Sequence, residues 1–512
     1  NLRDIKKEFC LSIKKKVSLL NKDTFYFLDR SESLSKIGWN SNDDNISKLW
    51  RYNQHYFDDL NAIGSFKRRM WHNELLESWI DQNKIGEGVG WEPYPTSLRI
   101  VNWIKWYFSG NHLSDSFIKS LALQARWLNK RVEWHILGNH LFSNAKALVF
   151  AGLFFSSKES ETWLKKGLKI INDELNEQVL YDGGNFERSP MYHAIFLEDI
   201  LDLINIAQTY PKVIEEKQVD EWIKSANSMI RWLDIMIHPD GKISFFNDAT
   251  LEFAPNFDQL IEYMQRLRMK YSSSKFNKVT YLSNSGYVRF TSNNIVALLD
   301  VAPIGPDYLP GHAHADTLSF ELSLFGQRLL VNCGTSEYEI GEVRQYERST
   351  KAHNTVVVNG KNSSEVWSSF RVARRAYPFD FKIEELENLV NIGCAHDGYK
   401  RLTGEAIHRR NWQFLKSSVV IKDNIEGSFK NAFAYFHFHP LIKISKKQNN
   451  TWNIKISNGR QLTLKVIKGE PFIKTSYYAP KFGKRLNTQC LKVALDSKEG
   501  SWIQISWDNL NE

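Results

Sequence analysis

Residues 183–193, Gly-Gly-Asn-Phe-Glu-Arg-Ser-Pro-Met-Tyr-His, place side chains that can move protons beside the predicted start of a helix. Pro190 fixes its own φ just before an apolar periodic run over residues 194–207, so Tyr192 should lie on the first helical turn. A phenol ordinarily ionises near pH ~10, so Tyr192 would need a positive field from Arg188 and nearby imidazoles to act as a base. The structural alternative is an ordinary helix entry with Tyr192 in the core.

Residues 138–144, Gly-Asn-His-Leu-Phe-Ser-Asn, begin another helical pattern after a loop that contains Glu133. In that position Asn139 would present an amide donor and His140 an imidazole. Neutral donors of this kind suit a substrate carboxylate whose negative charge must be reduced. The structural alternative is that Asn139 is only the N-cap of the helix, since Asn is a preferred cap residue.

Histidines occur in two later segments that each precede a predicted strand: residues 311–316, Gly-His-Ala-His-Ala-Asp, and residues 352–355, Ala-His-Asn-Thr. Side chains two residues apart on an extended segment point to opposite faces, so His312 and His314 should have different roles. One would face a cleft, and the other would bind a metal together with His353. The alternative is that all three histidines are structural.

An aromatic loop, Trp-Glu-Pro-Tyr-Pro-Thr-Ser-Leu-Arg over residues 91–99, precedes a further predicted helix. Flat rings such as Trp91 and Tyr94 suit the apolar faces of sugars, although a rigid connection between helices explains the loop almost as well. The chain has 17 Trp, 20 Tyr and 31 Phe, which is enough to line an extended groove as well as to fill cores.

Helical periodicity dominates the chain from residue 49 to residue 271. The predicted helices span residues 66–82, 96–109, 113–131, 140–156, 159–178, 193–209, 217–237 and 256–270. Helices in series with short connections favour antiparallel pairs closed into an (α/α) toroid. Residues 1–48 are polar and lysine-rich, and they should form a leader that packs on this domain.

A period of two residues replaces the helical period beyond a Ser/Lys/Asn-rich boundary at residues 272–278. Strands are predicted at residues 286–290, 295–301, 318–324, 328–331, 355–358, 417–421, 432–437, 452–456, 462–467 and 502–507. They predict a large antiparallel β-sandwich over residues 279–512, with residues 365–395 left unassigned. The predicted fold class is therefore multidomain α+β, an N-terminal toroid followed by a C-terminal sandwich.

The net charge of +9 and the pI near 9.0 favour an anionic partner. Nucleic acid is not expected, because zinc-finger spacing, RNA-binding signatures and long basic runs are missing, and residues 371–375 make only a short basic cluster typical of a solvated face. The four cysteines lie far apart, which indicates neither a disulfide framework nor a cysteine zinc site. No apolar run of about 18 residues predicts a transmembrane segment.

Four segments together resemble the heparinase II/III-like polysaccharide lyases, a superfamily that also includes alginate and oligoalginate lyases. They are residues 138–140, 186–193, 311–322 and 352–356, in the family's order. The similarity covers nearly the whole chain from about residue 50, and it implies the toroid and the sandwich. It also implies β-elimination at a 4-linked uronic acid, which leaves an unsaturated sugar at the new non-reducing end.

The resemblance implies a role for each matching residue. Asn139 and His140 are similar to the pair that neutralises the substrate carboxylate and thereby acidifies the C5 proton. Tyr192 is similar to the base, to the acid that protonates the leaving oxygen, or to both. His312 is similar to a histidine that closes the cleft from the second domain and can exchange roles with His140 according to the substrate epimer. The expected substrate-binding residues are Trp91, Tyr94, Arg99, Glu187, Arg188, His193, Tyr338 and Arg348.

A metal site in relatives uses one histidine of the His-X-His pair, an acidic residue and the histidine of the His-Asn-Thr segment. The matching positions in this chain are His314, Asn332 and His353. Because an amide oxygen is a weaker ligand than a carboxylate, the resemblance implies an empty or weakened structural site for zinc or calcium. No cofactor is expected in the chemistry itself.

The leading hypothesis is a bacterial polysaccharide lyase that acts on an anionic, uronate-containing polymer such as a glycosaminoglycan, alginate or exopolysaccharide. A second hypothesis is a non-catalytic polysaccharide-binding protein of a capsule or exopolysaccharide system. A third is a glycoside hydrolase, for which Glu92 and Glu187 are the only obvious carboxylates. The substrate class implies the periplasm or secretion, and the chain, which begins at Asn1, contains no intact signal peptide.

Overall fold

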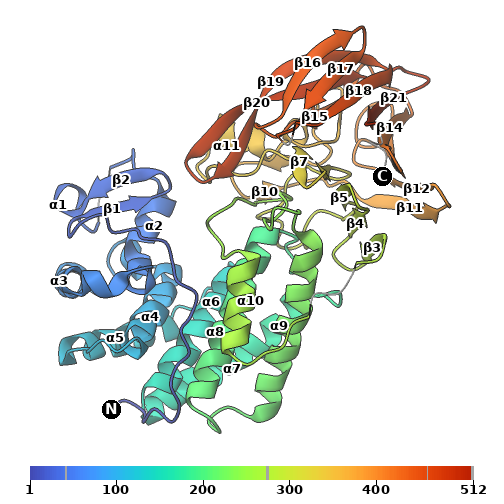
Figure 1. The fold of residues 1–512 in the computed structure, drawn as a ribbon. Helices are drawn as coiled ribbons and strands as arrows, with labels where there is room; N and C mark the ends of the chain where they lie inside the picture. Colours follow the sequence, from blue (N-terminus) through green and yellow to red (C-terminus); the bar gives the residue numbers. More distant parts are fainter. Residues whose placement is uncertain (41–42, 273–275, 458, 509–512) are drawn as a thin grey trace. The chain divides into compact units, whose positions relative to one another are not determined.

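The computed structural model describes residues 1–40, 43–272, 276–457 and 459–508, which form two compact units (Figure 1). Unit 1 contains residues 1–183, 194–231 and 255–273, and unit 2 contains residues 184–193, 232–254 and 274–512. The units therefore differ from the contiguous domains predicted from the sequence in two segments, 184–193 and 232–254. The predicted boundary at 272–278 lies partly outside the described residues.

Unit 1 is mainly helical, and its helices follow one another in the predicted order (Figure 1). It begins with a hairpin of β1 (Thr24–Phe27) and β2 (Arg30–Ser33) and a one-turn helix, α1 (Leu34–Ile37). The longer helices are α2 (Lys48–Tyr56), α3 (Arg69–Gln82), α4 (Pro93–Phe108), α5 (Asp115–Asn129), α6 (Gly138–Phe154), α7 (Lys158–Gln178), α8 (Pro190–Thr209), α9 (Glu216–Met236) and α10 (Phe257–Arg266), of which α8 begins and α9 ends within unit 2. The eight predicted helices are confirmed to within a few residues, whereas α2 was not predicted.

Helix α6 lies in the interior of unit 1, where it packs against α4 and α7. Its residues from Leu141 to Phe154 are all buried, as expected for a helix that is largely apolar on every side. Helix α7 approaches it closely at Gly167, where a Cβ would lie 2.8 Å from the carbonyl oxygen of Ala145. This packing fixes the first turn of α6, which carries two of the candidate catalytic residues.

Unit 2 is built mainly from antiparallel sheets, with the short helix α11 (Glu342–Glu347) between two of its strands. The described strands are β3 (Val279–Leu282), β4 (Tyr287–Thr291), β5 (Ile295–Asp300), β6 (Phe320–Leu324), β7 (Gln327–Leu330), β8 (Val356–Val358), β9 (Val366–Trp367), β10 (Arg371–Val372), β11 (Pro378–Glu385), β12 (Leu389–His396), β13 (Ile407–Leu415), β14 (Ser418–Glu426), β15 (Ala432–His437), β16 (Lys443–Gln448), β17 (Thr451–Lys455), β18 (Gln461–Lys468), β19 (Glu470–Lys481), β20 (Lys484–Ala494) and β21 (Ser501–Ser506). The strand orders of the three large sheets are β11-β12-β13-β14-β21-β18-β17-β16, β19-β20-β15-β8 and β3-β4-β5-β6-β7.

The large sheets of unit 2 share one apolar core. Alternate residues of a strand point to the same face, and β13 accordingly alternates buried with half-buried residues along its length. Leu322 of β6, Trp412 of β13 and Phe436 of β15 belong to one buried cluster. The predicted β-sandwich is therefore confirmed, and the unassigned residues 365–395 form β9, β10, β11 and most of β12. Across the described ranges of the chain, no helix is long and apolar enough to cross a membrane.

Candidate functional site

Tyr192 belongs to unit 2 and lies on the first turn of α8, as predicted, although the helix begins at Pro190, three residues before the predicted start. Its hydroxyl oxygen is 2.9 Å from that of Tyr338, 146 residues away. Its ring stacks on the imidazole of His312, with 3.8 Å between the ring centroids. Three side chains that can donate or accept protons therefore meet within this unit.

Tyr338 is suited to donate a hydrogen bond to Tyr192. Burial raises the pKa of Tyr338 well above its usual value, and the negative charge of Asp248 raises it further. Tyr338 consequently keeps its proton at neutral pH. Its ring is held edge-on by Phe370 and Phe482, at centroid distances of 5.3 and 5.0 Å. Because a hydrogen bond donated to a phenolate favours the ionised form, Tyr338 can ease proton loss from Tyr192.

Asp248, which no pattern in the sequence singles out, orients His312 and His314. Its Oδ2 is 2.9 Å from His312 Nδ1, and its Oδ1 is 2.8 Å from His314 Nε2. Both of its oxygens also accept hydrogen bonds from the guanidinium of Arg344. Burial alone would raise the pKa of Asp248, but Arg344 and the two histidines hold it well below its usual value. His312 is thus held by a carboxylate that stays charged.

His312 and His314 do not point to opposite faces, so that prediction is wrong. Residues 311–312 form a turn rather than a strand, and the alternation of an extended chain does not apply to them. Both imidazoles converge on Asp248 as a result. Glu187 adds a second carboxylate, with its Oε2 3.8 Å from His312 Nε2. His312 therefore contacts a phenol ring and has a carboxylate on the side of each ring nitrogen.

The predicted metal-binding residues are His314, Asn332 and His353, and their contacts do not fit a three-ligand site. His314 Nδ1 faces His353 Nε2 at 3.1 Å. Asn332 Oδ1 instead accepts a hydrogen bond from the backbone N–H of Asn354 at 3.0 Å, and its amide nitrogen donates to the carbonyl oxygen of Phe245 at 2.9 Å. Among the described residues, no group of three or more His, Cys, Asp or Glu is arranged to hold a metal. No chemical step proposed below passes through a metal.

Asn139 and His140 lie in unit 1, on the first turn of α6. The N-cap of this helix is Leu137, so the alternative that Asn139 is the cap residue is wrong. The His140 ring stacks on Tyr94 with 4.2 Å between centroids, and its Nδ1 is 3.2 Å from Glu133 Oε2. Backbone N–H groups at a helix N-terminus add partial positive charge. The arrangement is therefore suited to hold an anionic group.

The loop before α6 is fixed by Asn144, which the sequence did not mark as important. Its amide nitrogen donates to Glu133 Oε2 at 3.1 Å, and its Oδ1 accepts from the Glu133 backbone N–H at 2.9 Å. Glu133 Oε2 is thereby kept beside His140 Nδ1. Trp134 follows Glu133 in the loop and is 55 % exposed. An exposed indole beside a polar helix start suits stacking on a sugar, and no pattern in the sequence singles out this residue.

Five of the expected substrate-binding residues have contacts that stabilise the fold. Trp91 is 4 % exposed and Arg99 is fully buried, and both donate hydrogen bonds to backbone carbonyls. His193 is buried and accepts a hydrogen bond from a backbone N–H. Arg188 Nε donates to a backbone carbonyl, as do the guanidinium nitrogens of buried Arg348. The expected residues that contact candidate catalytic side chains directly are Tyr94, Glu187 and Tyr338.

The fold and these two groups of side chains define a protein that combines a helical toroid with a β-sandwich and carries a tyrosine–histidine site. A sequence profile described as "Heparinase II/III N-terminus" matches residues 34–275, and one described as "Heparinase II/III-like, C-terminal" matches residues 277–508. The chain belongs to the heparinase II/III-like family, which confirms the resemblance seen in its sequence.

Curated relatives of this chain include two proteins named heparin-sulfate lyase. The one from Bacteroides stercoris is 28% identical over 390 residues, which cover 71% of this chain and 56% of the relative. The one from Pedobacter heparinus is 26% identical over 268 residues, which cover 48% of this chain and 39% of the relative. The chain thus spans about half the length of the curated relatives it matches.

Solved structures of similar fold include two described as heparinase III and heparan sulfate lyase. The crystal structure of a heparinase III has a TM-score of 0.73 at 18% identity and covers 91% of this chain and 78% of that chain. The heparan sulfate lyase of Pedobacter heparinus has a TM-score of 0.63 at 18% identity, with coverages of 96% and 82%. At these identities the likeness shows the fold, an (α/α) toroid followed by a β-sandwich.

Proposed function

We propose that this chain is a polysaccharide lyase that cleaves a uronate-containing glycosaminoglycan by β-elimination. The observation that carries the proposal is the contact of Tyr192 with both His312 and Tyr338. The net charge of +9 favours an anionic polymer, and the names of the curated relatives favour a heparin-like one over alginate. Such a substrate implies action in the periplasm or outside the cell.

The proposed reaction divides between the two groups of side chains. Asn139 and His140 hydrogen-bond the uronate carboxylate, which stabilises the negative charge that develops there and acidifies the C5 proton. Tyr192 accepts that proton, the C5–H electron pair forms the C4=C5 double bond, and the bond from C4 to the leaving oxygen breaks. The leaving oxygen then receives a proton from Tyr192 or from His312. No water is consumed.

Tyr338 and Asp248 act through the residues that touch the substrate. Tyr338 is placed to donate to the ionised Tyr192 and would thereby lower the cost of its ionisation. Asp248 accepts a hydrogen bond from His312 Nδ1. His312 Nε2 is therefore the nitrogen that can exchange a proton with a sugar oxygen. Both are positioning residues in this mechanism.

A panel of uronate polysaccharides tests the proposal, with the wild-type chain and Tyr192→Phe assayed side by side. The wild-type chain should generate the ultraviolet absorbance of a conjugated C4=C5 bond with at least one sulfated glycosaminoglycan. Tyr192→Phe should lose at least about 100-fold in rate, as expected for removal of an acid–base group, yet still bind the polymer. Polymer binding without any absorbance change by the wild-type chain would support a non-catalytic binding protein instead.

A further inference from the structure

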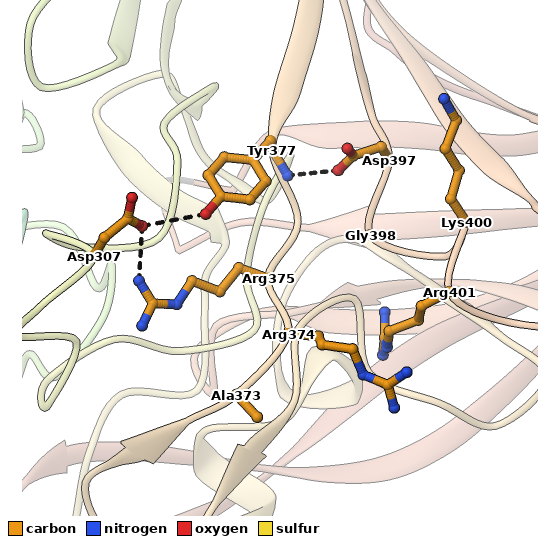
Figure 2. Close-up of a pocket in the computed structure, with 9 residues that line it drawn as sticks. All are labelled: Asp307, Ala373, Arg374, Arg375, Tyr377, Asp397, Gly398, Lys400 and Arg401. Atoms are coloured by element: carbon orange, nitrogen blue, oxygen red, sulfur yellow. Dashed lines mark hydrogen bonds and ion pairs between the residues drawn. The ribbon is translucent and has the colours of Figure 1, made fainter.

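Arginine and lysine side chains line a cavity in unit 2 that the reaction described above does not use. The cavity has a volume of about 560 Å³ (Figure 2). We call it the arginine pocket, and its lining residues are Asp307, Ala373, Arg374, Arg375, Tyr377, Asp397, Gly398, Lys400 and Arg401. The short basic cluster at residues 371–375, which the sequence suggested was a solvated face, therefore contributes two arginines to a concave surface.

Two of the cations in the arginine pocket are held in place. Arg375 Nη1 is 2.7 Å from Asp307 Oδ1, and its side chain is only 13 % exposed. Tyr377 donates its hydroxyl to the same carboxylate oxygen at 3.2 Å, as Figure 2 shows. Arg401 donates to the backbone carbonyls of Asn362 and Ser363, and its side chain is 11 % exposed. Its Nε also lies 3.7 Å from Glu365 Oε1, an oxygen that Arg374 shares, so one carboxylate is divided between two guanidinium groups and neutralises Arg401 only in part.

The other two cations are accessible. Arg374 pairs with Glu365 at 2.6 Å, but its side chain is 68 % exposed, and Lys400 is also exposed. Exposed ion pairs contribute little free energy because water screens them, so a bound anion can compete with Glu365 for Arg374. Four cationic side chains face two carboxylates in the pocket lining, which leaves an excess of positive charge.

The arginine pocket is connected to His312 by two short segments. Asp307 lies five residues before His312 on one loop. Phe370 lies five residues before Arg375, and its ring contacts His312 at a centroid distance of 5.8 Å. Five residues span at most about 18 Å, so the pocket lies within the reach of an oligosaccharide that extends from His312.

Two buried arginines hydrogen-bond the backbone of the hairpin of β9 and β10. This hairpin leads from Phe370, which contacts His312, to the arginine pocket. Arg348 donates to the carbonyls of residues 367, 368 and 371, and Arg344 donates to the carbonyl of Ser369. The same hairpin exposes the rings of Trp367 and Phe370, which are 55 and 41 % accessible. The exposed rings can stack on the apolar faces of sugars, and the neighbouring cations can bind anionic groups. The hairpin and the arginine pocket together therefore suit an anionic sugar chain.

We propose that the arginine pocket binds a sulfate or carboxylate group of the polysaccharide, at a sugar remote from the bond that is cleaved. Guanidinium groups match the geometry of such oxyanions and bind them with two parallel hydrogen bonds. The pocket would increase affinity for long, highly charged chains and leave the chemical step unchanged.

Binding measured without turnover tests this proposal, which depends on the proposed function only for the class of ligand. The Tyr192→Phe chain serves as the background, and the change is Arg374→Ala with Lys400→Ala. The control is Lys446→Ala with Lys447→Ala on β16, which removes the same charge from exposed positions of the same unit. Heparin and fully desulfated heparin are the probes, and the dissociation constant is measured at one salt concentration.

The pocket variant should bind heparin roughly tenfold more weakly than its parent, and the control should change affinity less than about threefold. A tenfold effect confined to heparin identifies sulfate as the occupant, and one that persists on the desulfated polymer identifies carboxylate. An equal loss of heparin affinity in the pocket variant and in the control, or no loss in either, would overturn the proposal. Because these measurements need no cleavage, they separate failure of the pocket from failure of the lyase proposal.

Discussion

Tyr338 contacts Tyr192, the proposed proton-transfer residue, and lies in the field of the buried carboxylate of Asp248. Its hydroxyl contacts that of Tyr192, while its ring packs between Phe370 and Phe482. Tyr338→Phe would keep the packing and delete the donor. A hydrogen bond to a charged group contributes about 1.5–3 kcal/mol, so the turnover number should fall by roughly 10- to 100-fold with little change in KM.

Steady-state kinetics on a cleavable polysaccharide would check this split between kcat and KM. Tyr346→Phe is a matched control, since it also removes a buried hydroxyl from unit 2, one that contacts Ser476 at 3.1 Å. Similar loss of turnover in both variants would show that the effect is on folding rather than on Tyr192.

Glu347 gives the folded chain a pH dependence that is separate from catalysis. Burial raises its pKa from 4.5 to about 7, against hydrogen bonds from Ser336 that lower it. A carboxyl with a raised folded-state pKa stabilises the fold fully below its unfolded pKa, and the contribution is lost as pH rises through about 7. Relative to Glu347→Gln, the wild-type free energy of unfolding should therefore fall between pH 4.5 and 7, by an amount on the order of 3 kcal/mol.

Denaturant unfolding of the two chains at several pH values measures this difference. A difference that stays constant over the range, or that grows with pH, would contradict the assignment of a protonated carboxyl to Glu347.

Each site residue selected from the sequence was marked by a pattern in the residues next to it. Asn139, His140 and Tyr192 lie at helix starts marked by Gly or Pro, and His312 lies just before a strand. Asp248 gives no such signal, because its role arises from contacts with His312 and Arg344, which are 64 and 96 residues away. Local pattern therefore marks the groups proposed to touch substrate but misses the carboxylate that holds His312.

Helix α6, which carries Asn139 and His140 on its first turn, packs closely on α7 where Gly167 meets Ala145. Gly167→Val would place a branched side chain against the Ala145 carbonyl oxygen, which a Cβ would approach to 2.8 Å. Overpacking of this kind typically costs about 1–3 kcal/mol and displaces the backbone. We expect a lower melting temperature together with reduced kcat.

Lys169→Val on the exposed side of α7 is the control, because it places the same β-branched residue in the same helix. If thermal denaturation and activity respond equally to both substitutions, the close approach of α6 and α7 is not what positions the site.

Helices were predicted more completely than strands, for a physical reason. An amphipathic helix such as α7 repeats its apolar face over many residues, and that period is visible in the sequence. Strand β16 is exposed at nearly every position and therefore shows no alternation. Exposed edge strands such as β16 were accordingly missed, and buried strands such as β5 were found. The interior strand β13 was also missed, because two of its buried positions are the polar His408 and Arg410.

The positive net charge of the chain should attract an anionic polymer. The net charge is +9, and ions screen such attraction over a Debye length of about 10 Å at 0.1 M salt. The dissociation constant of the Tyr192→Phe chain for heparin should rise steadily with salt concentration. Affinity that does not depend on salt would mean that charge is not the basis of recognition.

The division of the chain into two compact units could not be read from sequence. Residues 184–193 and 232–254 join the unit that holds the sandwich, although both lie within the helical half of the sequence. Their contacts are with residues far along the chain, as in the pair of Tyr192 and Tyr338. Helical periodicity identifies the type of element but not the unit to which a connecting segment belongs.

Mass spectrometry of the products formed from a sulfated glycosaminoglycan tests the central claim most directly. If the chain is a lyase, each new non-reducing end should carry a C4=C5 double bond with no water added for the bond cleaved, and Tyr192→Phe should yield neither product nor absorbance. Products with saturated non-reducing ends and a gain of one water for each bond cleaved would instead show hydrolysis and contradict the proposed elimination.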